Sequence, residues 1–433
     1  GLESDSPAEG SRLSVTSDLR GVEIDLPAPY GKAPDQPRRF WLEQPLNGAV
    51  STLAMGLGDQ AELQLRFEQN TLASGLLMLG ETQRLAHYPG LFLVTGQIDH
   101  LALDAWRPVL SRYRERADAM AGAASEAGDG ELMLAASQLR IDTFEGFSQR
   151  INDSLLDLRQ RPDSWWLSVV SPRFDGEMLI PDAGAGPLNV RLDRLQLPAT
   201  TVTTPGEGDV AESPLETFDL TALSRFSAYV AIADLHIGDE RYGSLNFELR
   251  TEPGRLQLAN LGGYVRDIRI GVDQPAYFEW VQSEDTSFSR LTGDFDFANV
   301  GRVLEQWHYE RFVESSYGQG AVDLRWPGGP QQWQLKRSDG SLSLLLKDGR
   351  FLKASQTTEG TLKAVGIVNL MNVVRRLRLD FTDLYEKGIS YDRVEGEARL
   401  AEGRLNIADN LVVDSPSSRF RLRGNADLRR KVL

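Results

Sequence analysis

Strict alternation of apolar and polar residues, repeated in short segments along the chain, constrains the fold most. Residues 62–68 (ELQLRFE) and 255–258 (RLQL) alternate in this way, and so do 341–344 (SLSL) and 419–423 (RFRLR). A period of two places Leu and Phe on one face of a strand and polar residues on the other, as in a half-buried antiparallel strand. Turn pairs such as Asp348-Gly349 and Pro253-Gly254 separate the segments. The pattern therefore predicts a long antiparallel meander.

Such a sheet must bury its Leu-rich face against something. Either the sheet closes on itself, or it curls into a trough whose apolar lining stays available. A continuous apolar surface of this kind marks a ligand groove or an interaction site. The ligand that suits an apolar trough is a hydrocarbon chain.

Helical periodicity interrupts the alternation at three places, each after a strand-like segment. The three predicted helices are capped by Asp104, Asn299 and Thr361. Residues 95–99 and 292–296 share the pattern Thr-Gly-x-(Ile/Phe)-Asp, which favours divergent internal repeats over coincidence. The apolar faces comprise Trp106, Val109, Leu110 and Tyr113 in the first helix, Val300, Val303, Leu304 and Trp307 in the second, and Ile367, Leu370, Met371 and Val374 in the third.

Two segments rich in small and polar residues, 117–131 and 203–214, predict flexible exposed loops. They separate three predicted β-groove segments: 1–116, which ends in a short helix, 132–202, and 215–433, which contains two short helices. No shift in composition marks a domain boundary, so we expect one continuous elongated domain.

The composition excludes several kinds of chemistry. The 433 residues include no Cys, which removes disulfides, thiolate nucleophiles and Cys-ligated zinc. A net charge of −15 argues against nucleic-acid binding, although residues 360–433 carry a small basic excess. The four His residues lack metal-ligand spacing, and no hydrolase, P-loop or dinucleotide motif occurs. We predict a non-enzymatic protein with no catalytic residues, no metal site and no cofactor.

Three stretches of sequence carry a resemblance to a known family. Residues 324–330 (LRWPGGP), with Trp333 and 340–344 (GSLSL) after them, resemble an L-x-W-P-G-x-P … G-x-L element of the YhdP family, within the AsmA-like superfamily. Residues 377–384 (LRLDFTDL), followed by Lys387-Gly388 and 394–396 (VEG), resemble a second element. Residues 16–32 (TSDLRGVEIDLPAPYGK) are similar to a third, and 90–106 resembles the stretch before the first internal helix.

The resemblance implies a fold like that of the bridge-like lipid-transfer proteins. We expect a mainly β protein: a long, twisted antiparallel sheet curled into an elongated, taco-like groove, with a few short amphipathic helices and 215–433 as the AsmA-like C-terminal part. The resemblance also implies a Gram-negative envelope protein in the periplasm, anchored in the inner membrane by an N-terminal helix that this sequence does not contain. No stretch of this sequence reaches the length of a membrane span.

The expected function is a non-enzymatic conduit that moves phospholipids between the inner and outer membranes. Its expected partners are phospholipid acyl chains, the two membranes and envelope proteins, with no nucleic acid. Two alternatives stay open, a periplasmic structural or regulatory scaffold that binds a partner protein and a carbohydrate-active β protein. Each groove candidate could instead pack under a helix. The groove-lining candidates are Leu63, Leu65, Phe67, Leu256, Leu258, Leu342 and Leu344.

Overall fold

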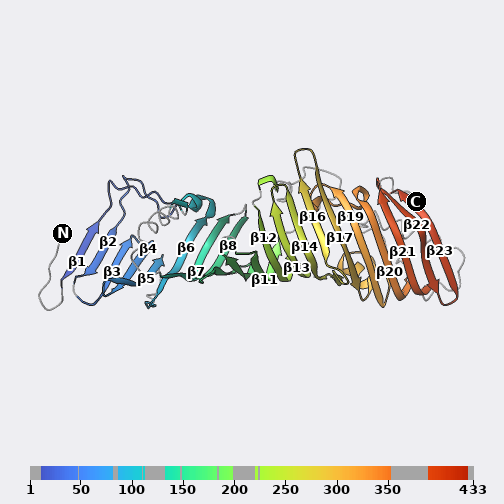
Figure 1. Ribbon diagram of the computed structural model, residues 1–433, viewed down its shortest axis with the longest axis horizontal. Coiled ribbons are helices and arrows are strands. Elements are labelled where there is room, and N and C mark those ends of the chain that lie inside the picture. The colour runs from blue at the N-terminus through green and yellow to red at the C-terminus, as the bar shows by residue number, and fades with distance from the viewer. Residues whose placement is uncertain are drawn as a thin grey trace. The chain divides into compact units, whose positions relative to one another are not determined.

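The computed structural model describes residues 11–46, 48–80, 86–109, 111–112, 132–146, 149–182, 185–197, 220–222, 225–352 and 389–427. Most of these residues lie in strands, which confirms the mainly β fold (Figure 1). The chain divides into two compact units, Gly1–Leu188 and Asn189–Leu433, and each is described by itself. The predicted loops 117–131 and 203–214 and the predicted helix after Thr361 lie outside the described residues.

In unit 1, each strand pairs with the next one along the chain. The strands are β1 (Arg12–Ser17), β2 (Phe40–Pro45), β3 (Val50–Leu57), β4 (Ala61–Glu68), β5 (Thr71–Leu79), β6 (Leu91–Ala102), β7 (Met133–Gly146), β8 (Gln149–Gln160), β9 (Ser164–Val170) and β10 (Phe174–Pro181).

Two pairings in unit 1 are parallel, β5–β6 and β6–β7, where the sequence predicts antiparallel pairs throughout. Alternation identifies the faces of a strand but not its direction, and a parallel neighbour needs a crossover connection. Around this point the sheet is buried on both faces, as parallel strands usually are. Leu76 and Met78 are buried on one face of β5, while Leu79 is buried on the other.

In unit 2, every recorded strand pairing is antiparallel. The strands are β11 (Leu188–Leu197), β12 (Phe226–Ile237), β13 (Glu240–Glu252), β14 (Arg255–Val265), β15 (Ile268–Ile270), β16 (Ala276–Gln282), β17 (Ser287–Phe297), β18 (Val313–Glu314), β19 (Tyr317–Pro327), β20 (Asp339–Phe351), β21 (Ile389–Ala401), β22 (Arg404–Ser415) and β23 (Ser418–Asp427). Short helical elements are η1 (Leu220–Ala222), α2 (Val300–Gln306), η2 (Pro330–Gln332) and η3 (Leu335–Arg337).

The second predicted helix is confirmed as α2. The Asn299 side chain accepts hydrogen bonds from the backbone N–H groups of Gly301 (2.8 Å) and Arg302 (3.2 Å), so it caps the helix as predicted. The first predicted helix also forms, over 103–109 and 111–112. It begins one residue before the predicted cap, so Asp104 lies in the first turn, where it forms an ion pair with Arg107 (3.2 Å).

Candidate functional site

Apolar residues stand next to one another from strand to strand across unit 1. Because antiparallel hairpins set the register and side chains alternate, residues that pair across strands share one face. One such row runs without interruption from β1 to β10. Its members are Val15, Leu42, Met55, Leu63, Leu77, Val94, Ala136, Leu158, Leu167 and Met178.

Unit 2 repeats this arrangement with two rows. The first crosses β12 to β23 and comprises Ala228, Leu249, Leu258, Phe278, Leu291, Leu324, Gly340, Leu400, Leu405 and Ala426. The second lies parallel to it and comprises Ile232, Leu245, Gly263, Ile270, Phe295, Gly320, Leu344 and Gly396. We call the side of each unit's sheet that carries these rows the apolar face.

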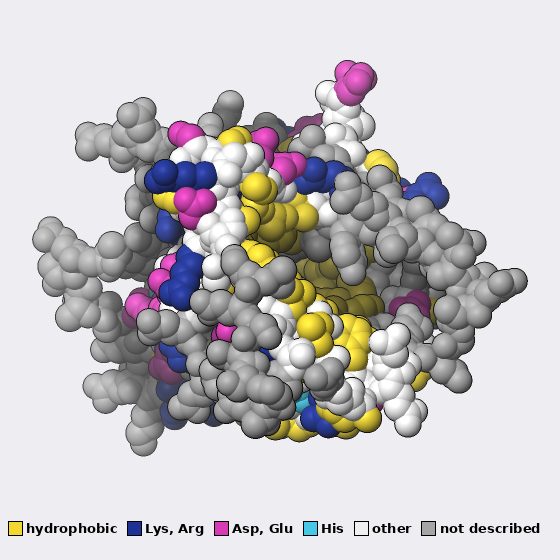
Figure 2. Space-filling view, turned by 90° about the vertical axis from the view of Figure 1, so that its left-hand side faces the viewer, with side chains coloured by type: hydrophobic (Ala, Val, Ile, Leu, Met, Phe, Trp, Pro, Cys, Tyr) yellow, Lys and Arg dark blue, Asp and Glu magenta, His cyan; other side chains and the backbone are white. Residues whose placement is uncertain are grey.

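The opposite face of unit 2 is polar. A register row on that face comprises Thr292, Asp323, Ser341, Arg399, Asn406 and Asn425. Arg290 forms a bidentate ion pair with Asp323, from Nε to Oδ1 at 3.0 Å and from Nη2 to Oδ2 at 2.9 Å. Figure 2 looks at the molecule from the side where β1 lies and shows hydrophobic side chains gathered in a hollow near the middle, with Lys, Arg, Asp and Glu side chains mainly along the left and top of the view.

Part of the apolar face of unit 1 is covered. Tyr30, from the connection between β1 and β2, and Trp106, from the first helix, pack edge to face at 5.9 Å between ring centroids. Both lie against a cluster that contains Leu79, Ile98 and other residues of the apolar face. The connection itself is held by buried Lys32, whose Nζ donates hydrogen bonds to three backbone carbonyls, of Leu19, Val22 and Ala33.

In unit 2, α2 covers one end of the apolar face. Val300, Val303 and Leu304 pack against a core cluster that includes Phe297 and Leu346. The predicted apolar side of this helix therefore faces the sheet, with Trp307 at its end.

Arg266 fixes the C-terminal end of α2. Its buried guanidinium lies 3.9 Å from the ring centroid of Tyr242 and 5.2 Å from that of Trp307, and donates a 2.8 Å hydrogen bond to the carbonyl of Gln306. It also pairs with Glu240, which His308 approaches at 2.8 Å. The hydrogen bond from Arg266, and to a smaller extent the one from His308, lowers the pKa of Glu240 below its ordinary value.

The connection between β19 and β20 covers the other end of the apolar face in unit 2. Leu335 packs against the cluster of Leu324, Trp326 and Leu400. The apolar face is therefore covered at two places, by α2 and by this connection. Between them Leu344 is 38% exposed, with Gly320 and Gly396 as its neighbours on the adjacent strands.

The structure groups the seven predicted groove residues by unit. Leu63, Leu65 and Phe67 lie on the same face of β4 in unit 1, and all are partly exposed. In unit 2, Leu256 and Leu258 on β14 share the apolar face with Leu342 and Leu344 on β20. Leu342 packs against the Leu324 cluster, as Leu335 of the covering connection does.

The apolar face includes residues that the sequence analysis does not identify. Phe278 and Leu291 belong to the rows, but their segments lack the clean alternation that singles out β4, β14 and β20. Their cross-strand partners reveal them only once the register is known.

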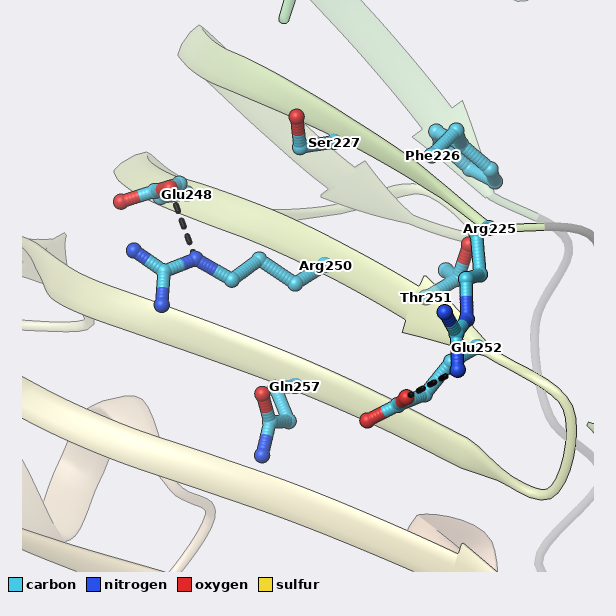
Figure 3. Close-up of a pocket in the computed structure, with 8 residues that line it drawn as sticks. All are labelled: Arg225, Phe226, Ser227, Glu248, Arg250, Thr251, Glu252 and Gln257. Carbon is cyan, nitrogen blue, oxygen red and sulfur yellow. Dashed lines mark hydrogen bonds and ion pairs between the residues drawn. The ribbon is translucent and has the colours of Figure 1, made fainter.

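The polar hollow drawn in Figure 3 has a different character from the apolar face. Most of its lining is charged or polar, with Phe226 as the one apolar member: Arg225, Phe226, Ser227, Glu248, Arg250, Thr251, Glu252 and Gln257. Arg250 pairs with Glu248 at 2.8 Å and Arg225 with Glu252 at 3.8 Å, so its charges are compensated from within. It offers no apolar lining comparable to the rows.

The four His residues all have partners within the fold: His87 lies 3.0 Å from Ser74, His100 pairs with Glu145, His236 with Asp234 and His308 with Glu240. Among the described residues, no cluster of three or more His, Asp or Glu side chains could hold a metal ion. A search of the same residues also finds no helix with the length and hydropathy of a membrane span.

These features define a class: mainly β proteins whose sheet curls around a continuous apolar face, with a polar opposite face in unit 2. Comparison with protein families then matches residues 2–433 to the YhdP protein family. The chain belongs to the YhdP family.

One similar relative is the intermembrane phospholipid transporter YhdP of Escherichia coli strain K12. It is 24% identical over 166 residues, which cover 34% of this chain and 13% of that protein. The matched segment is therefore a small part of the relative. Comparison with solved structures finds no match.

Proposed function

We propose that this chain forms part of a non-enzymatic lipid conduit, in which phospholipid acyl chains lie on the apolar face of each unit. The observation that carries the proposal is the register row: ten apolar or glycine residues in succession across the strands, in each unit. Family membership and the name of the E. coli relative support phospholipids as the cargo.

The geometry supports movement of a lipid as well as its binding. Burial of one CH₂ group contributes about 0.8 kcal/mol, so an acyl chain leaves water only where apolar contact continues. Because the rows run across the strands, a chain that shifts by one strand exchanges one set of apolar neighbours for a similar set. Such a surface holds acyl chains without a deep trap at any one strand. It supplies no direction, which must come from outside the chain.

The proposed cellular location is the periplasm, in a protein anchored in the inner membrane. It is supported by the name of the E. coli relative, which places that protein's activity between two membranes. Its proposed partners are the phospholipids, the inner and outer membranes, and envelope proteins that contact the sheet.

A scaffold that binds a partner protein is the second candidate function. The observation that favours it is the half-exposed apolar face itself, since such a face also suits a protein surface. The two candidate functions differ in whether the isolated protein keeps bound phospholipid: a conduit should, and a scaffold should not.

Lipid extraction tests the proposal. The chain is purified without detergent from cells rich in phospholipid, and its extract is measured by mass spectrometry. We expect phospholipid in stoichiometric amounts. Protein recovered free of lipid, and still free after incubation with phospholipid vesicles, would contradict the conduit and favour the scaffold.

A further inference from the structure

The connection between β19 and β20, residues 328–338, is a fixed element that we call the rim segment. The Oγ–H of Ser289 donates to the carbonyl of Gly328 at 2.9 Å, and the indole N–H of Trp326 donates to that of Gly329 at 3.0 Å. Gly328 has φ +85°, and a Cβ there would collide with the side chain of Gln332. The segment is therefore held tightly at its start by residues of the apolar face.

Leu335 holds the middle of the rim segment. It packs against Leu324, Trp326 and Leu400, two of which belong to the first register row of unit 2. The segment thus lies over the apolar face, at the end of the strands away from α2. A lipid whose acyl chains occupy that face would have its head group near this edge or the opposite one.

Three side chains of the rim segment are exposed around Leu335. Trp333 is 51% exposed, and Lys336 and Arg337 are exposed as well. Within the part of the chain that the structure describes, neither cation has a carboxylate within ion-pair distance, and the Trp333 indole N–H has no recorded acceptor. An exposed Trp beside Lys and Arg is the combination that proteins place at a lipid–water boundary.

At the same end of the strands, the neighbouring connections carry acidic residues or an arginine that is already paired. The turn after β16 contains Glu284 and Asp285. Arg255, at the start of β14, is paired with Glu279 at 3.0 Å. Asp339, two residues after Arg337, accepts a hydrogen bond from the backbone of Glu402 at the same end of the strands. Lys336 and Arg337 thus form a local pair of exposed cations without an ion-pair partner among the described residues, on a chain of net charge −15.

We propose that the rim segment binds the phosphate of an anionic phospholipid head group while the acyl chains of that lipid lie on the apolar face of unit 2. The proposal rests on the proposed function and adds a head-group preference to it. Lys336 and Arg337 supply the positive charge, because an anionic head group can form ion pairs with both of these exposed cations. Trp333 contacts the glycerol and carbonyl region, where its ring is apolar and its N–H finds an acceptor.

Lipid competition tests this. The full chain is incubated with vesicles of equal parts phosphatidylglycerol and phosphatidylethanolamine, separated from them, and its bound lipids are quantified. We expect roughly threefold enrichment of phosphatidylglycerol on the wild-type protein, since two exposed ion pairs are each worth only a modest amount. Salt should reduce the enrichment, because exposed charges are screened.

Two double variants separate the rim segment from general charge. Lys336→Gln with Arg337→Gln should abolish the enrichment. Arg399→Gln with Arg421→Gln removes the same charge from the polar face and should preserve the enrichment. Enrichment that survives the first pair, or is lost equally in both, would overturn the inference.

The remaining outcomes distinguish the inference from the proposed function. Lipid bound without any preference for phosphatidylglycerol overturns the head-group site alone. A wild-type protein that binds no lipid overturns the proposed function, and this inference with it. A protein that sediments with phosphatidylglycerol vesicles yet carries no excess of that lipid when separated would place the rim segment on bilayer surfaces, contrary to the inference.

Discussion

Leu344 is the residue at which the proposal can be tested with least disturbance of the fold. It lies between Gly320 and Gly396 and is 38% exposed, so a carboxylate there would reach water. We expect Leu344→Asp to leave the thermal transition nearly unchanged and to reduce bound phospholipid at least tenfold, since tenfold is about 1.4 kcal/mol and a carboxylate against an acyl chain costs more than the roughly 1–3 kcal/mol of an uncharged polar group.

Ser341→Asp is the matched control for Leu344→Asp, because it adds the same charge to the same strand on the polar face. It should leave bound phospholipid unchanged. Equal loss of lipid in both variants would contradict a role specific to the apolar face. Unfolding of unit 2 by Leu344→Asp would place Leu344 in a closed core and not on a binding face.

Gly320 illustrates why the second row contains glycines. A Cβ at this position would lie 2.4 Å from the backbone oxygen of Ser343 and 2.6 Å from the ring of Phe295. Gly320→Ala should therefore lower the free energy of unfolding by about 1–3 kcal/mol. Gly424→Ala is its control, because a Cβ there meets no described atom within 4 Å, and it should be neutral. Equal urea midpoints for the two variants would contradict this account.

Among the elements, α2 could be predicted from sequence because its signals are local. Asn299 and the spacing of Val300, Val303 and Leu304 lie within six residues. The covering role of Leu335 could not be predicted in this way, since it depends on Leu400, 65 positions along the chain. The same is true of Tyr30, which reaches Trp106 across five strands of unit 1.

The cap of α2 gives a prediction about this element. Asn299→Ala removes the acceptor for two backbone N–H groups and should cost about 0.5–2 kcal/mol. This corresponds to a fall in Tm of roughly 1–4 °C. Asn299→Asp keeps an acceptor in place and should stay close to the wild-type Tm. A Tm of Asn299→Ala equal to that of Asn299→Asp would show that the cap contributes nothing.

The ion pair of Arg266 with Glu240, at the C-terminal end of α2, is expected to weaken in acid. Hydrogen bonds from Arg266 and His308 lower the pKa of Glu240 below its ordinary value of 4.5. A depressed carboxylate pKa stabilises the fold above the unfolded pKa, and the stabilisation is lost as pH falls through the folded pKa. Wild type should exceed Glu240→Gln in Tm at pH 7, and the difference should shrink as pH falls below about 4.5. A difference that is constant with pH would contradict this role for Glu240.

At the scale of the whole molecule, alternation predicted the mainly β fold and the existence of two chemically distinct faces. It did not predict the parallel pairs β5–β6 and β6–β7, because alternation carries no information about strand direction. Nor did it identify row members such as Phe278 and Leu291, whose place depends on register. Leu63, Leu258 and Leu344 were accessible to sequence reasoning because their strands alternate cleanly.

The central claim is that acyl chains contact the apolar face and not the polar one. Site-specific photo-crosslinking tests it most directly, with a crosslinking residue at Leu63, Leu258 or Leu344 and, as matched controls on the opposite face one or three residues away, at Gln64, Gln257 or Ser341. The proposed function predicts phospholipid adducts by mass spectrometry at the first three positions and few or none at the controls. Equal yields on both faces, or adducts to protein alone, would contradict it.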